Sequence, residues 1–381
     1  MAAYVTNERI EALQYVRALA VLLTLLAHLA FVTDVPDLRY IRFVANHAQF
    51  WGGVELFFVV SGYVITASLT RALDQSRRGV MKAFYIKRAT RLFPAAWLWI
   101  AVPLLGVHFF NSSGVFGDPA QVWRNALACV LFVQNINLTV DPATSLAVYW
   151  SLSIEEQFYL IYPWLLLMAR KKIGWLAFLL LLPQFLMPRI VSQAELVSMM
   201  RYDAILWGVW LHQAAKTDAF ARIMGVFRGW HILALALALI GICVAPVQFA
   251  KIRYAFSATD FFCMVFIAIT VAYARESVIT RPAGLRSALN WLGDRSYAIY
   301  LAHIPVFLAV READMRWALN LAPDAITDVQ ILIPFALTLI VADLTYQFVE
   351  EPLRDWGRGH AARMDNRVDL AKLSQNPGEL S

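Results

Sequence analysis

Two ionisable side chains, Arg17 and His28, interrupt the first apolar stretch of the sequence. They are eleven residues apart, which on a helix brings them within about 20° of one face and separates them by roughly 16 Å along the axis. Thr24 falls on that face as well, so we expect these side chains to line one cavity. An imidazole there can act as a general base or proton relay near neutral pH. A histidine that only bonds to a neighbouring helix is the structural alternative.

Carboxylates occur in two further apolar segments. In GVELFFVVSGYVIT we expect Glu55 close to the outer membrane boundary, where it can orient a positive partner such as His28. YWSLSIEEQFYLIYP contains Glu155 and Glu156, which point about 100° apart on a helix, so only one faces the interior and we expect Glu155. A structural ion pair is the alternative for Glu155, and a role in helix packing is the alternative for Glu55. The small residues Gly52, Gly53, Ser61 and Gly62 suit close packing between helices.

Two later motifs add candidate site residues. FYIKRATRLFP places Arg88 and Arg91 on one helical face, where two guanidinium groups can grip the phosphates of a cytoplasmic cofactor such as coenzyme A. Contacts with anionic lipid headgroups would explain the same basic residues. SYAIYLAHIPV aligns Tyr300 with His303 on one face, as further residues of the cavity or as interfacial packing.

Membrane helices are the elements that must position these side chains. The chain has 381 residues, of which 60% are hydrophobic and 16% charged, and apolar runs of 17 to 22 residues recur along it. Such runs cross a bilayer as helices and are too long and too continuous for barrel strands. We therefore predict an all-α polytopic membrane protein with about ten transmembrane helices. The expected spans are residues 13–31, 53–70, 93–110, 149–169, 174–190, 199–215, 230–248, 258–274, 290–310 and 328–349.

Basic residues give the expected orientation. The loop 71–91 carries seven Lys and Arg residues against one acid, which marks it, and with it both termini, as cytoplasmic. Its amphipathic part, Val80 to Phe93, should lie along the inner surface. Val122 to Leu138 is expected to be a re-entrant or surface helix, because an eleventh crossing would reverse the later basic loops. Residues 1–353 then form the membrane domain and 354–381 a polar cytoplasmic tail.

Several other classes of site lack support in the sequence. The three cysteines, Cys129, Cys243 and Cys263, are isolated and fit neither a disulfide framework nor a metal site. There is no P-loop, HExxH or GxSxG motif, so neither metal catalysis nor a covalent serine mechanism is indicated. The net charge of +6 belongs to the loops between spans, and we expect membrane lipids rather than nucleic acid as contacts.

Taken in order, the segments resemble the acyltransferase 3 family of integral membrane O-acyltransferases. The resemblance rests on the Arg, ten residues, His pattern at Arg17 and His28, on the four segments quoted above, and on YQFVEEPLR near residue 350. It implies a ten-helix bundle that transfers an acyl group, usually acetyl, from acyl-CoA to a hydroxyl of a carbohydrate or other small acceptor. It makes His28, Arg17 and Glu155 the catalytic candidates and Arg88 and Arg91 the cofactor-binding ones.

The chain departs from the family pattern at three positions. Glu55 stands where Asp is frequent, Ala302 where Trp is frequent and Glu351 where Arg is frequent. Many relatives carry a fused SGNH hydrolase-like domain, whereas we expect a stand-alone membrane domain here, in a bacterial inner membrane. The acceptor would then be modified within that domain or with help from a separate acceptor-side protein. A proton-coupled or lipid-linked transporter, or a structural or sensory protein, would also retain buried His, Arg and Glu.

Overall fold

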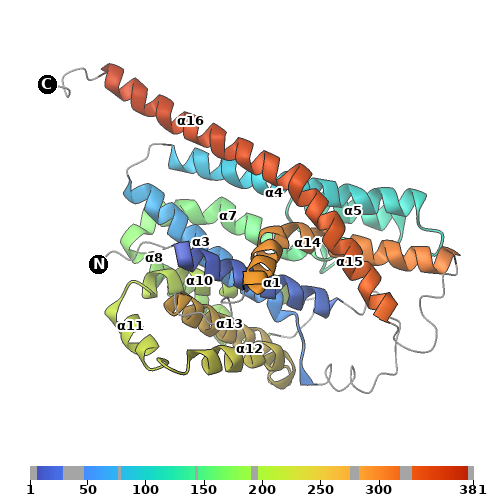
Figure 1. Ribbon diagram of the computed structural model, residues 1–381, viewed down its shortest axis with the longest axis horizontal. Coiled ribbons are helices and arrows are strands. Elements are labelled where there is room, and N and C mark those ends of the chain that lie inside the picture. Colours follow the sequence, from blue (N-terminus) through green and yellow to red (C-terminus); the bar gives the residue numbers. More distant parts are fainter. Residues whose placement is uncertain are drawn as a thin grey trace.

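The computed structural model describes residues 7–28, 47–75, 79–141, 145–189, 196–274, 283–317 and 328–375, and within these ranges the chain forms helices and no strands (Figure 1). Each of the ten expected spans overlaps a helix. The longer helices are α1 (Asn7–Ala27), α3 (Gly52–Asp74), α4 (Val80–Phe109), α7 (Tyr149–Ala169), α8 (Ile173–Leu186), α12 (His231–Gln248), α13 (Ala255–Ala272), α14 (Ala283–Trp317), α15 (Asp328–Thr345) and α16 (Glu351–Gln375). The shorter ones are α5 (Pro119–Val130), α6 (Gln134–Asn137), η2 (Arg170–Lys172), α9 (Leu196–Met199), α10 (Asp203–Ala214), α11 (Asp218–Gly225) and the π-helical turn η4 (Tyr346–Glu350).

Five of the described helical stretches are long and apolar enough to cross a membrane. They are Gly52–Asp74, Val80–Phe109, His231–Gln248, Ala255–Ala272 and Leu332–Arg363. The chain is therefore an integral membrane protein, while the count of about ten crossings stays a prediction.

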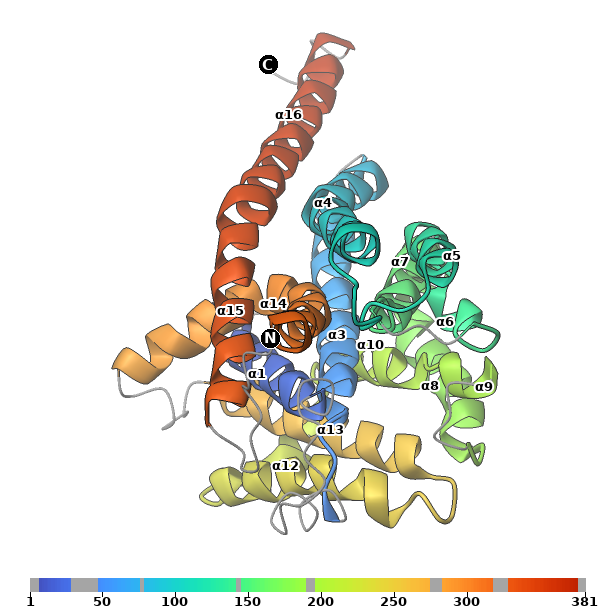
Figure 2. The same ribbon diagram turned by 90° about the vertical axis from the view of Figure 1, so that its right-hand side faces the viewer.

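Helix α3 lies in the middle of the bundle and packs against α1, α10 and α13 (Figure 2). Its contact with α10 depends on two glycines: a Cβ atom at Gly62 would lie 2.1 Å from the carbonyl oxygen of Ile205, and one at Gly208 would lie 2.1 Å from that of Val59. Because glycine has no side chain, the two backbones can approach closely, as the small residues of α3 predicted.

Helix α1 lies between α3 and α14. Glycines again mark the contacts, since a Cβ atom at Gly53 of α3 would lie 2.4 Å from the Ala20 carbonyl oxygen, and one at Gly293 of α14 would lie 2.5 Å from that of Gln14. These two close approaches fix α1 from both sides and so set the direction of its polar side chains.

Helix α4 differs from the prediction. The segment Val80 to Phe93, expected to lie separately along the membrane surface, is the first half of one 30-residue helix that is about 45 Å long. Phe84 and Leu92 are buried, and α4 packs against α16, where Gly357 meets Thr90. The segment is therefore continuous with the expected span that follows it, while its position along the inner membrane surface stays a prediction.

The segment 122–138 does not form one long helix. Helix α5 has 12 residues, or about 18 Å, and Phe132 then takes a positive φ of 54° before the short α6. This agrees with the expectation of a short helix instead of an eleventh crossing.

The C-terminal part is helical across the predicted domain boundary. Helix α15, the turn η4 and α16 follow one another without a loop, and α16 extends beyond the other helices in Figure 1. The polar segment that begins at residue 354 therefore starts inside a helix whose Ala361 is fully buried. The division at residue 353 stays a prediction.

Candidate active site

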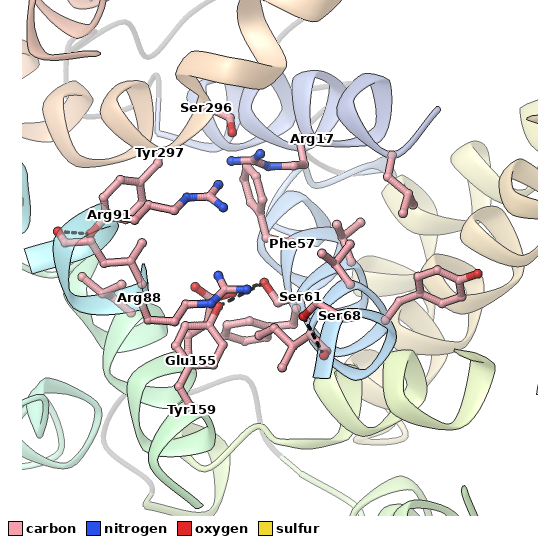
Figure 3. Close-up of a pocket in the computed structure, with 18 of the residues that line it drawn as sticks. Arg17, Phe57, Ser61, Ser68, Arg88, Arg91, Glu155, Tyr159, Ser296 and Tyr297 are labelled. Carbon is pink, nitrogen blue, oxygen red and sulfur yellow. Dashed lines mark hydrogen bonds between the residues drawn. The ribbon is translucent and has the colours of Figure 1, made fainter. Parts of the chain in front are cut away.

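A cavity of about 310 Å³ is lined by side chains of α1, α3, α4, α7 and α14 (Figure 3). These helices lie far apart in the sequence, so the packing described above is what assembles the site. Ser68 and Arg71, near the end of α3, line the cavity and are exposed to solvent. The cavity is therefore open near the C-terminal end of α3.

Positive charge dominates the described lining. It contains four arginines and one carboxylate, namely Arg17, Arg71, Arg88, Arg91 and Glu155. Figure 3 shows the guanidinium groups of Arg17 and Arg91 pointing toward one another across the space. Four positive charges against one negative charge in a partly enclosed space attract an anion. The expected pair on one face of α4, Arg88 and Arg91, is thus found in the cavity.

Two of these arginines are held by neighbouring side chains. Arg17 donates a hydrogen bond from Nη1 to Gln14 Oε1 at 2.9 Å. The guanidinium of Arg88 lies over the ring of Tyr159, 4.9 Å from its centroid, and 5.7 Å from that of Phe84. A guanidinium held over an aromatic ring keeps its N–H groups directed outward from its own plane, where they can still donate to a bound phosphate.

Glu155 is the acid of α7 that faces the cavity. It accepts a hydrogen bond from the Ser61 hydroxyl of α3, and the Tyr159 hydroxyl lies 3.5 Å from the same Ser61 oxygen. Glu156 does not line the cavity. The choice of Glu155 over its neighbour as the inward carboxylate is therefore confirmed, while its catalytic role stays a prediction.

His28 lies outside the cavity and pairs with His303. Nε2 of His303 is 3.2 Å from Nδ1 of His28, and the ring centroids are 4.9 Å apart. Neither histidine is in the lining, whereas Arg17 and Tyr300 are. The expectation that Arg17 and His28 line one cavity is thus not met, because roughly 16 Å of helix separates them. Tyr300 connects the cavity to the histidine pair, because it lines the cavity and its carbonyl oxygen lies 2.6 Å from Nδ1 of His303.

Glu55 has a different partner from the one expected. Its carboxylate forms a buried ion pair with Arg201 and not with His28. The Arg201 guanidinium is also surrounded by rings, with centroids of Trp51, Trp150 and Phe256 at 5.1, 5.0 and 4.0 Å. These contacts give Glu55 a structural role as the partner of Arg201, which the sequence did not predict.

Other charged side chains pair across helices in ways that sequence neighbours did not indicate. Asp203 binds Arg189, not the nearby Arg201, and Arg295 binds Asp343, not the adjacent Asp294. Asp294 accepts from Gln14 at 2.7 Å instead. Arg295 and Asp343 link α14 to α15, whereas Arg189 follows α8 and binds Asp203 at the start of α10.

Several polar lining residues were missed as site residues from the sequence, among them Ser61, Arg71, Ser151 and Tyr159. Ser61 was interpreted as a packing residue, and Arg71, Ser151 and Tyr159 were not singled out. One signal was present, because Tyr159 follows Glu155 by four residues and shares its helical face. Ser151 had no such signal, since its partner, the Tyr300 hydroxyl at 2.6 Å, comes from α14.

Comparison with known proteins gives the family of the chain. It is 28% identical over 342 residues to the O-acetyltransferase OatA of Staphylococcus aureus (strain NCTC 8325 / PS 47), covering 80% of this chain and 53% of that protein. It is 27% identical over 365 residues to the peptidoglycan O-acetyltransferase OatA of Listeria monocytogenes, covering 84% and 55%. The chain thus spans about half the length of these relatives, and no solved structure matches it. The model of the acyltransferase domain Acyl_transf_3 matches residues 10–347, so the chain belongs to this family of acyltransferases.

Proposed function

We propose that the chain is a membrane-embedded O-acyltransferase that transfers an acyl group, acetyl in the first instance, from acyl-CoA to a hydroxyl of a carbohydrate or other small acceptor. The observation that carries the proposal is the cavity with four arginines and one carboxylate in a chain of the acyltransferase family. The donor, the acceptor and the roles of the individual residues are all part of the proposal.

The donor fits the charge and the position of the cavity. Coenzyme A carries several phosphate charges, and Arg88 and Arg91 offer paired N–H donors to such oxygens. The exposed mouth at Ser68 and Arg71 lies beside the basic segment between α3 and α4, which is typical of the cytoplasmic side, where acyl-CoA is made. A volume of about 310 Å³ is at the low end for ligand sites, so the nucleotide would stay near the mouth while the thioester arm extends inward.

The chemistry needs a base for the acceptor hydroxyl. His28 removes its proton, the hydroxyl oxygen forms a bond with the thioester carbonyl carbon, and the carbon–sulfur bond breaks. The proton then passes to the departing thiolate of coenzyme A. Arg17, roughly 16 Å away along α1, holds the anionic or pantetheine part of the donor and does not contact the same carbonyl as His28. Glu155 balances the charge of the arginines, whose guanidinium groups lie near it.

A carbohydrate acceptor has support from the relatives. The Listeria relative is named a peptidoglycan O-acetyltransferase, and peptidoglycan is a carbohydrate polymer. We place the protein in the inner membrane of a bacterium, with both termini in the cytoplasm, so that the acceptor side lies opposite the cavity mouth. A separate acceptor-side protein can then take part in delivery.

The test is an assay of purified protein with radiolabelled acetyl-CoA and a panel of carbohydrate acceptors. The parent should release coenzyme A and label an acceptor, and His28→Ala should abolish both. His360→Ala, which changes a histidine of α16 outside the cavity lining, is the matched control and should keep parent activity. Substrate flux without consumption of acetyl-CoA would contradict the proposal and favour a transporter, and full activity of His28→Ala would remove His28 from the mechanism. Mass spectrometry of surface glycans with and without the gene identifies the acceptor.

A further inference from the structure

The two paired histidines come from different helices and meet in the interior of the bundle. His28 is at the end of α1, and His303 is in the middle of α14, where it is fully buried. His303 also contacts the rings of Tyr300 and Phe307, at centroid distances of 5.7 and 5.9 Å. Its ring is therefore held on several sides, and it presents Nε2 to His28.

Backbone carbonyls assign the protons on both rings. Nδ1 of His28 lies 2.9 Å from the Thr24 carbonyl oxygen, and Nδ1 of His303 lies 2.6 Å from the Tyr300 carbonyl oxygen. A carbonyl oxygen only accepts, so each Nδ1 must carry a hydrogen. In a neutral imidazole the other nitrogen then holds the lone pair.

The contact between the rings follows from this assignment. His303 Nε2 has a lone pair and points at His28 Nδ1, which has the hydrogen, so His28 donates and His303 accepts over 3.2 Å. The proton of His28 is thus kept on Nδ1 by two acceptors, Thr24 and His303. Its lone pair is on Nε2, the nitrogen that a general base would use.

We infer that His303 is a positioning residue for His28: its Nε2 accepts the Nδ1–H of His28, which orients the ring, fixes the tautomer with a basic Nε2 and stabilises the imidazolium formed during transfer. A third group that orients a catalytic base in this way is common in acyl-transfer enzymes, usually as a carboxylate. In this protein the neutral imidazole of His303 orients the base, so no second charge is placed in an apolar region. The inference rests on the proposed function only in giving His28 the role of base.

The position of Tyr300 places this pair beside the donor route. Tyr300 lines the cavity, and its carbonyl oxygen holds His303 one turn further along α14. A thioester arm that passes the ring of Tyr300 therefore approaches the histidine pair. His28 can therefore reach the thioester as the base, although it lies next to the cavity and not in its lining.

Two substitutions separate positioning from packing. In His303→Gln the side-chain oxygen can reach the former place of Nε2, whereas in His303→Asn the amide reaches only as far as Nδ1 and leaves no acceptor for His28. We expect His303→Gln to keep kcat within about tenfold of the parent and His303→Asn to lower it by about 100-fold, with KM for acetyl-CoA changed less than about threefold in both. Equal losses in the two variants, or parent activity in His303→Asn, would overturn the inference.

A spectroscopic measurement on the parent protein tests the tautomer without any activity assay. In protein labelled with ¹⁵N-histidine at about pH 8, where an ordinary imidazole is neutral, His28 should show a protonated Nδ1 and an unprotonated Nε2. A coupling across the hydrogen bond should connect its Nδ1 to His303 Nε2, and the signals are assigned by their loss in His28→Gln. A protonated His28 Nε2 would overturn the inference. If the parent transfers no acyl group, the proposed function fails, while this spectrum still decides whether His303 sets the tautomer.

Discussion

The hydroxyl of Ser61 in α3 donates a hydrogen bond to the carboxylate of Glu155 in α7, at the edge of the arginine-lined cavity. The bond joins two helices that are separated by more than 90 residues of sequence. It also holds the carboxylate in the cavity lining, so Glu155 contributes its negative charge to the site.

Replacing Glu155 by Gln should impair acyl transfer, because the arginines lose the carboxylate that balances their charge and holds their orientation. A hydrogen-bonded charged group contributes roughly 1.5–3 kcal/mol, so we expect a loss of about 10- to 100-fold in kcat/KM. Glu156→Gln changes the adjacent acid, which does not line the cavity, and is the matched control. Ser61→Ala should give a smaller loss than Glu155→Gln. Steady-state kinetics would refute this account if the two Gln variants behaved alike.

The buried pair of Glu55 and Arg201 should matter mainly for stability. Both side chains are nearly inaccessible to solvent, so Glu55→Gln removes the ion-pair partner of Arg201. It should lower the free energy of unfolding by about 3 kcal/mol, the low end for a broken buried pair, because Asp203 and Asp260 still lie near the guanidinium. Removing both charges, by Glu55→Gln together with Arg201→Gln, should cost less than the sum of the single changes. Thermal unfolding in detergent measures the effect.

The control for this pair is Asp74→Asn, because Asp74 is an exposed acid at the other end of α3. Its replacement should leave the unfolding temperature close to that of the parent. Additive effects of the two single changes at Glu55 and Arg201 would show that the ion pair does not exist in solution.

The close contact of α3 with α10 predicts a steric effect at Gly62. In Gly62→Ala the new Cβ atom would meet the Ile205 carbonyl oxygen, so the helices must separate, at a cost of about 1–3 kcal/mol. Gly359→Ala adds the same atom in open space on α16 and should be neutral or stabilise by up to ~1 kcal/mol. The two variants are compared by thermal unfolding. Equal stability of both would contradict the packing of α3 on α10.

Most helices could be predicted from the sequence because long apolar runs end at charged residues. The run at 149–169 was placed correctly, since Arg170 and the lysines after it stop the apolar stretch. The first half of α4 was not joined to the span that follows it, because its basic residues resemble those of a surface helix and its packing partner α16 comes about 270 residues later. Patterns within one segment cannot indicate a partner so far away.

The site was predictable in its residue types but not in its pairings. Helical geometry put Arg88 and Arg91 on one face and allowed only one of Glu155 and Glu156 to face inward, and the structure places Arg88, Arg91 and Glu155 in the cavity lining. The partners of Glu55 and His28 could not be deduced, because a side chain in a bundle binds whichever helix packs beside it. For these two residues that neighbour proved to be Arg201 and His303.

The central claim, that the arginine-lined cavity binds the phosphates of acyl-CoA, is tested most directly by titrating coenzyme A into purified protein in lipid nanodiscs by calorimetry. The control is Lys87→Ala, which removes an exposed positive charge next to Arg88 from the same helix. We predict that the parent and Lys87→Ala bind alike, while Arg88→Ala combined with Arg91→Ala weakens binding by about 100-fold or more, since two charge-assisted contacts are lost. Unchanged binding by the double variant, or no binding by the parent, would contradict the account.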